Sequence, residues 1–100
     1  MHIIIWEYHV KAEKRSEFEK IYSSSGAWTE LFKTDTEYIE TEFLHNPDQA
    51  SRYLTIDRWK SKEAYKNFCI QYEKEHRALD AQCAELTERE FLIGVWDSIR

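Results

Sequence analysis

The side chains best suited to proton transfer in this sequence are His76, Asp57 and Tyr8, and they lie in three different predicted elements. His76 is on the apolar stripe of a long predicted helix, and histidine readily exchanges a proton near neutral pH. Asp57 lies in the middle of a predicted strand, between Ile56 and Arg58. A buried carboxylate at this position could serve as a general base, and Tyr8 could orient a substrate by hydrogen bonding. These three residues are the candidate catalytic residues.

His76 and Asp57 each have a structural interpretation as well. Asp57 could form an ion pair with Arg52 or with Arg58 of a second copy, and we favour such a pair over a catalytic role. His76 could be a hydrogen-bonded histidine at the edge of the core, which is the commoner situation for a histidine on a helix. The sequence leaves these alternatives open.

Large aromatic side chains form a second group of candidates. Aromatic residues make up 15% of the chain, and such rings can line a cavity for a flat organic ligand. The alternative for each ring is that it fills the core of a small protein. The candidate substrate-binding residues are Trp6, Trp28, Phe32, Trp59, Phe68 and Tyr72.

Other kinds of site are poorly supported by the sequence. The four histidines are not at paired metal-ligand spacing, and the two glycines provide no phosphate-binding loop. We therefore predict no metal and no cofactor. The net charge of −5 argues against nucleic acid as a partner. No apolar run approaches the about 20 residues of a membrane-spanning helix, so no membrane association is expected.

The two cysteines, Cys69 and Cys83, lie 14 positions apart in one predicted helical stretch. On a continuous helix with a rise of about 1.5 Å per residue, their backbones would be about 21 Å apart. This separation is too large for a disulfide. Reduced thiols are typical of a cytoplasmic protein, and we expect that location.

The elements that position the candidate residues follow from the hydrophobic periodicity. Alternating or continuous apolar runs predict strands at 2–10, 38–45, 52–59 and 88–99. Helical spacing predicts helices within 11–22, 27–32 and 61–86, the last with a bend between Arg77 and Asp80. The order β-α-β-β-α-β predicts an α+β ferredoxin-like fold in which the helices cover one face of a four-stranded antiparallel sheet. We expect a single domain over residues 1–100.

Both faces of the predicted sheet are apolar. In the first strand, one face carries His2, Ile4, Trp6, Tyr8 and Val10, and the other carries Ile3, Ile5, Glu7 and His9. In the last strand, simple alternation places Leu92 and Trp96 on one side and Phe91, Ile93 and Val95 on the other. The helices cover only one of these faces, and an apolar face of this size is rarely left in water. A second copy related by a two-fold axis is therefore expected to cover it, which predicts a homodimer.

Two stretches of the chain resemble a known family. YLTIDRWKSKEAYKNF (53–68) resembles the strand-turn-helix passage of the antibiotic biosynthesis monooxygenase branch of the dimeric α/β-barrel superfamily. WEYHVKAEKRSEFEKIY (6–22) is similar to the first strand and helix of that branch. The resemblance covers nearly the whole chain. It implies ferredoxin-like subunits that pair sheet against sheet, with a pocket between the helices and the sheet of each subunit.

Members of this branch include cofactor-free monooxygenases that act on polycyclic aromatic molecules, heme-degrading enzymes and proteins with no known activity. In the heme-degrading members a histidine late in the long helix holds the iron, and His76 is the nearest match. Those members also use an asparagine in the first strand and a tryptophan in the long helix. The corresponding positions here hold Trp6 or Glu7, and Phe68, so heme degradation is disfavoured.

The resemblance thus implies a small homodimeric protein, with a cofactor-free monooxygenase acting on an aromatic or polycyclic molecule as the first candidate function. The alternative is a non-catalytic dimeric module for ligand binding or assembly. A cavity with inward-pointing polar groups would favour the enzyme. A completely filled core would favour the module.

Overall fold

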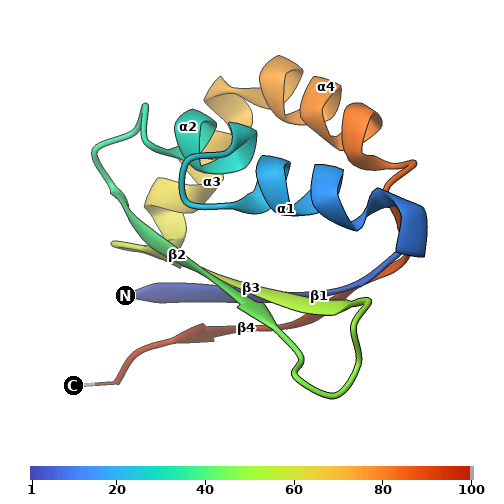
Figure 1. The fold of residues 1–100 in the computed structure, drawn as a ribbon. Helices are drawn as coiled ribbons and strands as arrows, with labels where there is room; N and C mark the ends of the chain where they lie inside the picture. The colour runs from blue at the N-terminus through green and yellow to red at the C-terminus, as the bar shows by residue number, and fades with distance from the viewer. Residues whose placement is uncertain (100) are drawn as a thin grey trace.

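The four strands form one antiparallel sheet in the order β2-β3-β1-β4 (Figure 1). The computed structural model describes residues 1–99. The strands are β1 (His2–Val10), β2 (Tyr38–His45), β3 (Arg52–Trp59) and β4 (Thr87–Asp97). They are rich in β-branched and aromatic residues, which suit a pleated surface. The predicted α+β ferredoxin-like fold is confirmed.

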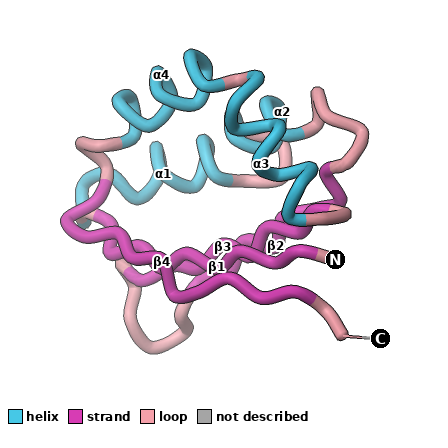
Figure 2. Tube along the Cα trace, turned by 180° about the vertical axis from the view of Figure 1, so that it is seen from behind, coloured by secondary structure: helices cyan, strands magenta, loops and turns pink. Residues whose placement is uncertain are grey.

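All of the described helices lie on one face of this sheet, as the view from behind also shows (Figure 2). They are the short 3-10 helix η1 (Ala12–Lys14), α1 (Arg15–Tyr22), α2 (Ala27–Phe32), α3 (Lys62–Gln71) and α4 (Glu73–Cys83). None of the helices within residues 1–99 has the length and apolar character that crossing a membrane requires. The opposite face of the sheet is not covered by any described element.

Local chemistry defines where two of the helices begin. A Cβ atom on Gly26 would lie 2.2 Å from the carbonyl oxygen of Ile21, so only glycine allows the chain to pass this close to the end of α1. The α2 helix then starts at the next residue. Ser61 is the N-cap of α3, and its hydroxyl accepts a hydrogen bond from the Ala64 backbone N–H at 3.1 Å.

The long helix predicted over 61–86 bends at Tyr72, so the prediction of a bend between Arg77 and Asp80 is wrong. Tyr72 has φ −110° and ψ 30°, outside the helical region, and it separates α3 from α4. This break lets α3 contact β3 while α4 contacts α2. The apolar stripe continues through both helices, so periodicity gives no signal of where the axis changes direction.

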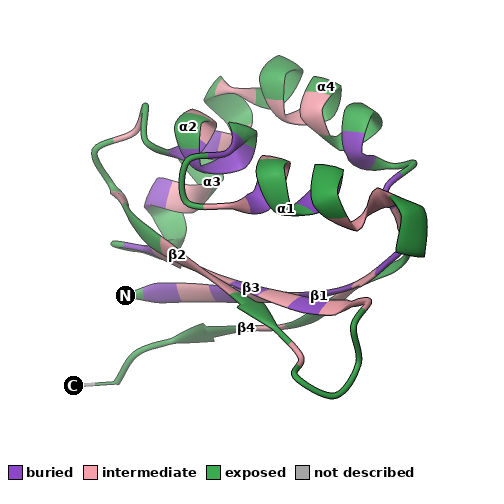
Figure 3. Cartoon of the chain, in the orientation of Figure 1, coloured by how far each residue is buried: buried purple, intermediate pink, exposed green. Residues whose placement is uncertain are grey.

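The hydrophobic core lies between the helices and the sheet, where the buried residues gather (Figure 3). It is largely aromatic. Phe18 stacks on Tyr22 with ring centroids 4.1 Å apart, and Trp59 packs against Phe68 at 4.9 Å. In β1, the face that carries His2, Ile4, Trp6, Tyr8 and Val10 points to the helices. Cys69 and Cys83 are both free, and Cys83 is buried in this core.

Simple alternation in the last strand fails because of a β-bulge. The pairing of β1 with β4 shifts between Ile5 and Trp6, so that Ile93 is an extra residue in β4. Leu92 is opposite Trp6, on the helix side, whereas Trp96 is opposite Ile3, on the outer side. The prediction that Leu92 and Trp96 share a face is therefore wrong. One inserted residue reverses the phase of a pattern whose period is two.

Candidate active site

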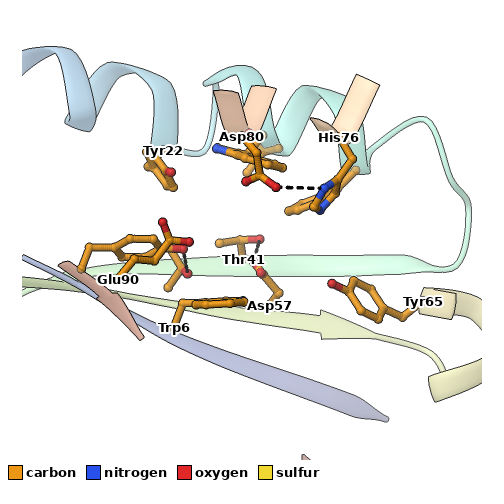
Figure 4. A pocket seen from close by; sticks show the side chains of 13 residues that line it. Trp6, Tyr22, Thr41, Asp57, Tyr65, His76, Asp80 and Glu90 are labelled. Atoms are coloured by element: carbon orange, nitrogen blue, oxygen red, sulfur yellow. Dashed lines mark hydrogen bonds and ion pairs between the residues drawn. The ribbon is translucent and has the colours of Figure 1, made fainter. Parts of the chain in front are cut away.

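A cavity of about 120 Å³ lies between the helices and the centre of the sheet (Figure 4). Aromatic rings, threonines, carboxylates and one histidine form its lining. The structure brings together six of the predicted site residues here: Trp6, Tyr8, Trp28, Phe32, Asp57 and His76. The core is therefore not completely filled, and the opening coincides with the predicted catalytic residues.

Sheet register explains why the residues on the floor of the cavity converge. Thr55 and Asp57 are two residues apart in β3 and therefore point to the same face. Thr55 is opposite Trp6 of β1, and Asp57 is opposite Thr41 of β2. Figure 4 shows the Trp6 ring lying along the sheet beside Asp57. The floor is therefore built from three adjacent strands.

Helices α2 and α4 provide the upper wall. Trp28 and Phe32 are four residues apart in α2 and so share one face of that helix. His76 comes from α4, and its ring packs edge-on against Trp28 with centroids 5.2 Å apart. The His76 side chain is 30% exposed and its Nδ1 lies 3.3 Å from Oδ2 of Asp80. His76 thus faces the cavity with a carboxylate beside it.

Trp59, Phe68 and Tyr72 do not belong to the cavity lining. Trp59 and Phe68 are fully buried in the aromatic core, and Tyr72 packs on Phe68 with centroids 5.1 Å apart. The Phe32 ring packs against both, with its centroid 5.6 Å from that of Trp59 and 5.5 Å from that of Phe68. The rings of Trp59 and Phe68 therefore support the cavity wall from behind.

Asp57 is the most deeply placed carboxylate of the site, with 9% of the residue exposed. Its Oδ1 accepts a hydrogen bond from the Thr41 hydroxyl at 2.6 Å, and Thr41 accepts one from the Tyr38 hydroxyl at 2.8 Å. Within residues 1–99 no hydrogen bond reaches the other carboxylate oxygen, and no cation pairs with Asp57. Burial raises the pKa of Asp57 to about 6, and the Thr41 hydrogen bond opposes that rise.

The predicted ion pair between Asp57 and Arg52 is wrong. Arg52 binds Glu7 at 3.0 Å instead. Arg52 and Asp57 are five positions apart in β3, so their side chains point to opposite faces of the sheet. Arg58 also points to the outer face, where it pairs with Glu40 and Glu42. Asp57 lies on the helix-covered face, so a second copy that binds the outer face would not bring its Arg58 next to Asp57.

Tyr8 is held in a fixed position beside the cavity. Its hydroxyl lies 2.9 Å from the Thr55 hydroxyl, so the two groups share a hydrogen bond. Burial raises the pKa of Tyr8 well above its ordinary value, and nearby carboxylates including Asp57 add to this effect. Tyr8 is therefore a neutral phenol at physiological pH and can donate or accept a hydrogen bond.

Sequence reasoning did not identify two carboxylates that line the cavity, Asp80 and Glu90. A sequence signal for Asp80 was present, because it follows His76 by four residues and so lies on the same helix face. Glu90 is opposite Tyr8 in the β1–β4 pairing. That relation depends on the register around the β4 bulges, which the sequence does not give.

The arrangement can support proton abstraction in a cavity walled largely by aromatic rings. Asp57 provides a carboxylate that is ionised above pH about 6, with one oxygen free to face a ligand. Tyr8 from the sheet and His76 from α4 provide further hydrogen-bonding groups in the lining. In the part of the chain that the structure describes, no group of three or more histidine, cysteine or acidic side chains is placed to hold a metal ion.

Comparison with solved structures places the fold among known proteins. SnoaB from Streptomyces nogalater, described as a cofactor-independent oxygenase, has a TM-score of 0.74 at 15% identity, over 99% of this chain and 93% of its own. The Rv0793 protein from Mycobacterium tuberculosis has a TM-score of 0.73 at 13% identity, over 99% and 95% of the two chains. These likenesses show the fold.

Sequence comparison identifies the family. A search of curated protein sequences gives no match. The family model described as antibiotic biosynthesis monooxygenase matches residues 1–79, which include both stretches whose resemblance to this family was noted from the sequence. The chain belongs to the antibiotic biosynthesis monooxygenase family.

Proposed function

We propose that this protein is a cofactor-independent monooxygenase that oxidises a small aromatic molecule bound in the cavity between helices and sheet. The observation that supports this most strongly is Asp57, a buried carboxylate with a free oxygen in an aromatic enclosure. Membership of the family is consistent with such chemistry. The fold is also that of SnoaB, which is described as a cofactor-independent oxygenase.

The proposed reaction uses the substrate itself as the reductant. Asp57 removes a proton from an activated CH₂ group, and the resulting electron-rich substrate transfers one electron to O₂. The substrate radical and superoxide combine, and a proton converts the adduct to a hydroperoxide. Loss of water from the hydroperoxide leaves a carbonyl group. In total, one CH₂ group and one O₂ become one C=O group and one H₂O, and Asp57 regains its original ionisation state.

The size of the cavity limits which substrates could bind in it. A cavity of roughly 150 Å³ accommodates benzene, so the cavity here, at about 120 Å³, has room for no more than one ring, with any substituent extending toward the exposed Asp80. We therefore propose a substrate with a single aromatic ring. A polycyclic molecule or heme would require the helices to move away from the sheet.

We also propose that the protein acts as a homodimer in the cytoplasm. The uncovered outer face of the sheet carries many apolar side chains, which include Ile3, Ile5, Leu54, Ile56, Phe91 and Trp96. Trp96 is 50% exposed in the single chain. A second copy with the same face would bury these residues, and the covered sheet would support the floor of the cavity.

Oxygen consumption tests the proposed reaction. Purified protein is supplied with single-ring aromatic compounds that carry an activated CH₂ group, in buffer treated to remove metals. We expect consumption of one O₂ per carbonyl formed, and Asp57→Asn should lower the rate at least 100-fold because the base is lost. The matched control is Glu88→Gln, which neutralises an exposed carboxylate outside the cavity and should leave the rate unchanged.

The His76→Ala variant tests whether His76 acts on a ligand or only supports the fold. We expect this variant to lose ligand binding or turnover while its melting temperature barely changes, because His76 is partly exposed. A destabilisation of about 2 kcal/mol or more would instead indicate a packed, hydrogen-bonded core residue. Binding of aromatic compounds without any oxygen consumption would identify a binding module and reject the monooxygenase.

A further inference from the structure

The charges around the cavity have one sign. Three carboxylates line it, those of Asp57, Asp80 and Glu90, and no lysine or arginine of residues 1–99 does. His76 is the single basic side chain in the lining, and it already pairs with Asp80. The Asp57 and Glu90 carboxylates have no ion-pair partner within the described chain. The cavity therefore has an excess of negative charge.

These carboxylates are arranged along the depth of the cavity. Asp57 is at the floor and is nine-tenths buried, with one oxygen that no protein donor reaches. The Asp80 side chain is 57% exposed, and Glu90 is also exposed, so these two residues lie at the solvent end. Asp80 adds to the effect of burial in raising the pKa of Glu90, which indicates that the two carboxylates are close enough to interact.

The remaining walls suit the same kind of ligand. Six of the lining residues are aromatic: Trp6, Tyr8, Tyr22, Trp28, Phe32 and Tyr65. The face of an aromatic ring attracts a cation, and the attraction is strongest for tryptophan and in sites shielded from water. Aromatic faces together with a buried carboxylate form the type of enclosure that binds organic cations.

We infer that the cavity selects a positively charged single-ring aromatic molecule, such as an arylalkylamine, over neutral and anionic molecules of the same shape. This inference rests on the proposed function and specifies its substrate class. An anion would meet the Asp80 and Glu90 carboxylates at the entrance and Asp57 at the floor, without any lysine or arginine to compensate. A cation would meet attraction at each of these points.

A cationic substrate also suits the proposed proton abstraction. Removing a proton from a neutral molecule leaves an anion, which would be destabilised next to Asp80 and Glu90. Removing a C–H proton from a molecule that carries an ammonium group leaves a species with no net charge, so the total negative charge of the occupied cavity is lower than with a neutral substrate. The charge of the lining therefore favours the same class of molecule for binding and for reaction.

Three probes of matched shape test this inference: phenethylamine, phenethyl alcohol and phenylacetate, which are cationic, neutral and anionic near neutral pH. Binding is followed by calorimetry and by tryptophan fluorescence, to which Trp6 and Trp28 of the lining contribute, at low and at high salt. We expect phenethylamine to bind about tenfold more tightly than phenethyl alcohol, and phenylacetate to bind most weakly. A tenfold difference corresponds to about 1.4 kcal/mol.

Variants locate the origin of the preference. Asp57→Asn should remove most of the preference for the amine and leave the affinity for the alcohol within about twofold. Asp80→Asn combined with Glu90→Gln should weaken amine binding by a smaller factor and reduce its dependence on salt. The control Glu88→Gln, on the same strand as Glu90 but outside the cavity, should change neither.

The possible outcomes are distinguishable. If the alcohol or phenylacetate binds as tightly as the amine, the charge inference is wrong and the proposed monooxygenase function stands. If the amine is preferred but Asp57→Asn keeps the full preference, the inference is also wrong, because the selectivity arises elsewhere. If none of the probes binds, both the inference and the proposed aromatic-binding function are overturned.

Discussion

Glu7 and Asp57 are both 9% exposed, yet they lie on opposite faces of the same sheet and have opposite electrostatic environments. Glu7, on the outer face, binds Arg52 at 3.0 Å and His9 at 2.7 Å. These hydrogen bonds, chiefly the one from Arg52, lower the pKa of Glu7. Asp57, on the helix face, has a threonine hydroxyl as its neighbour, and burial raises its pKa to about 6.

This difference shows that burial alone does not determine what a carboxylate does in a fold. A buried carboxylate that is paired contributes to stability when it is ionised, whereas one without a cation reduces stability when it is ionised. Glu7 fits the first description and Asp57 the second. A carboxylate that reduces stability at neutral pH is more readily explained by function than by folding.

The two faces also differ in what covers them. The helices and the cavity cover the face that carries Asp57, while the face that carries Glu7 is open and apolar within the described chain. Glu7 and its partners form a small polar group among isoleucines, leucines and aromatic rings. The predictions below test whether the outer face is structural and the helix face functional.

The largest effect is expected for Ile3→Asp on the outer face. Ile3 is opposite Arg58 and Trp96, on the outer face near the start of β1. If a second copy covers this face, the new carboxylate is buried and the dimer loses several kcal/mol. Sedimentation at micromolar concentration should show the native protein as a dimer and the variant as a monomer with a lower melting temperature.

The control for this change is Ile70→Asp in α3, where the isoleucine is 72% exposed. This variant should remain a dimer with an unchanged melting temperature. A monomeric native protein, or a dimeric Ile3→Asp variant of full stability, would show that the outer face is not the interface.

A somewhat smaller effect of the opposite sign is expected for Asp57→Asn. The folded pKa of about 6 lies above the ordinary value of 3.8, so the folded state holds the proton more tightly and native stability falls as pH rises from about 4 to 6. At neutral pH the variant should be more stable by about 3 kcal/mol, since each pKa unit corresponds to about 1.4 kcal/mol. Urea unfolding near pH 7 and below pH 4 measures this.

The gain in stability should disappear below pH 4, where Asp57 is protonated in both the folded and the unfolded state. An asparagine variant that is less stable than the native protein at neutral pH would mean that the Asp57 carboxylate is paired in solution. In that case the contrast with Glu7 would not hold.

Glu7→Gln is expected to have the smallest effect of the three. Removing the charge weakens two charge-assisted hydrogen bonds of the Glu7 side chain, one with Arg52 and one with His9, which should cost about 2 kcal/mol near neutral pH. Because the folded pKa of Glu7 is lowered, this stabilisation is present above the unfolded pKa and is lost as pH falls through the folded pKa. The same urea series measures it.

A Glu7→Gln variant as stable as the native protein near neutral pH would contradict this prediction. Glu7→Gln and Asp57→Asn should therefore change the free energy of unfolding in opposite directions at pH 7. In acid, both variants should be as stable as the native protein. Parallel changes would show that the two carboxylates have similar environments.

The sequence by itself determined the order and type of the elements and which residues of β1 share each of its two faces. Period-two and helical patterns are local properties, and the order β-α-β-β-α-β admits few topologies. Periodicity was also enough to propose six residues that line the cavity, because each lies on the apolar face of a predicted helix or in a predicted strand: Trp6, Tyr8, Trp28, Phe32, Asp57 and His76. Even the absence of an Arg52–Asp57 pair could have been read from their odd spacing in one strand.

The tertiary structure alone decided three other features. The β4 bulge set which of Leu92 and Trp96 points outward, and the break at Tyr72 set the direction of α4. The placement of α4 and β4 then brought Asp80 and Glu90 to the cavity, while Trp59, Phe68 and Tyr72 became part of the packed core. These features depend on how elements far apart in the chain pack in three dimensions, and packing is a collective property that no local pattern encodes.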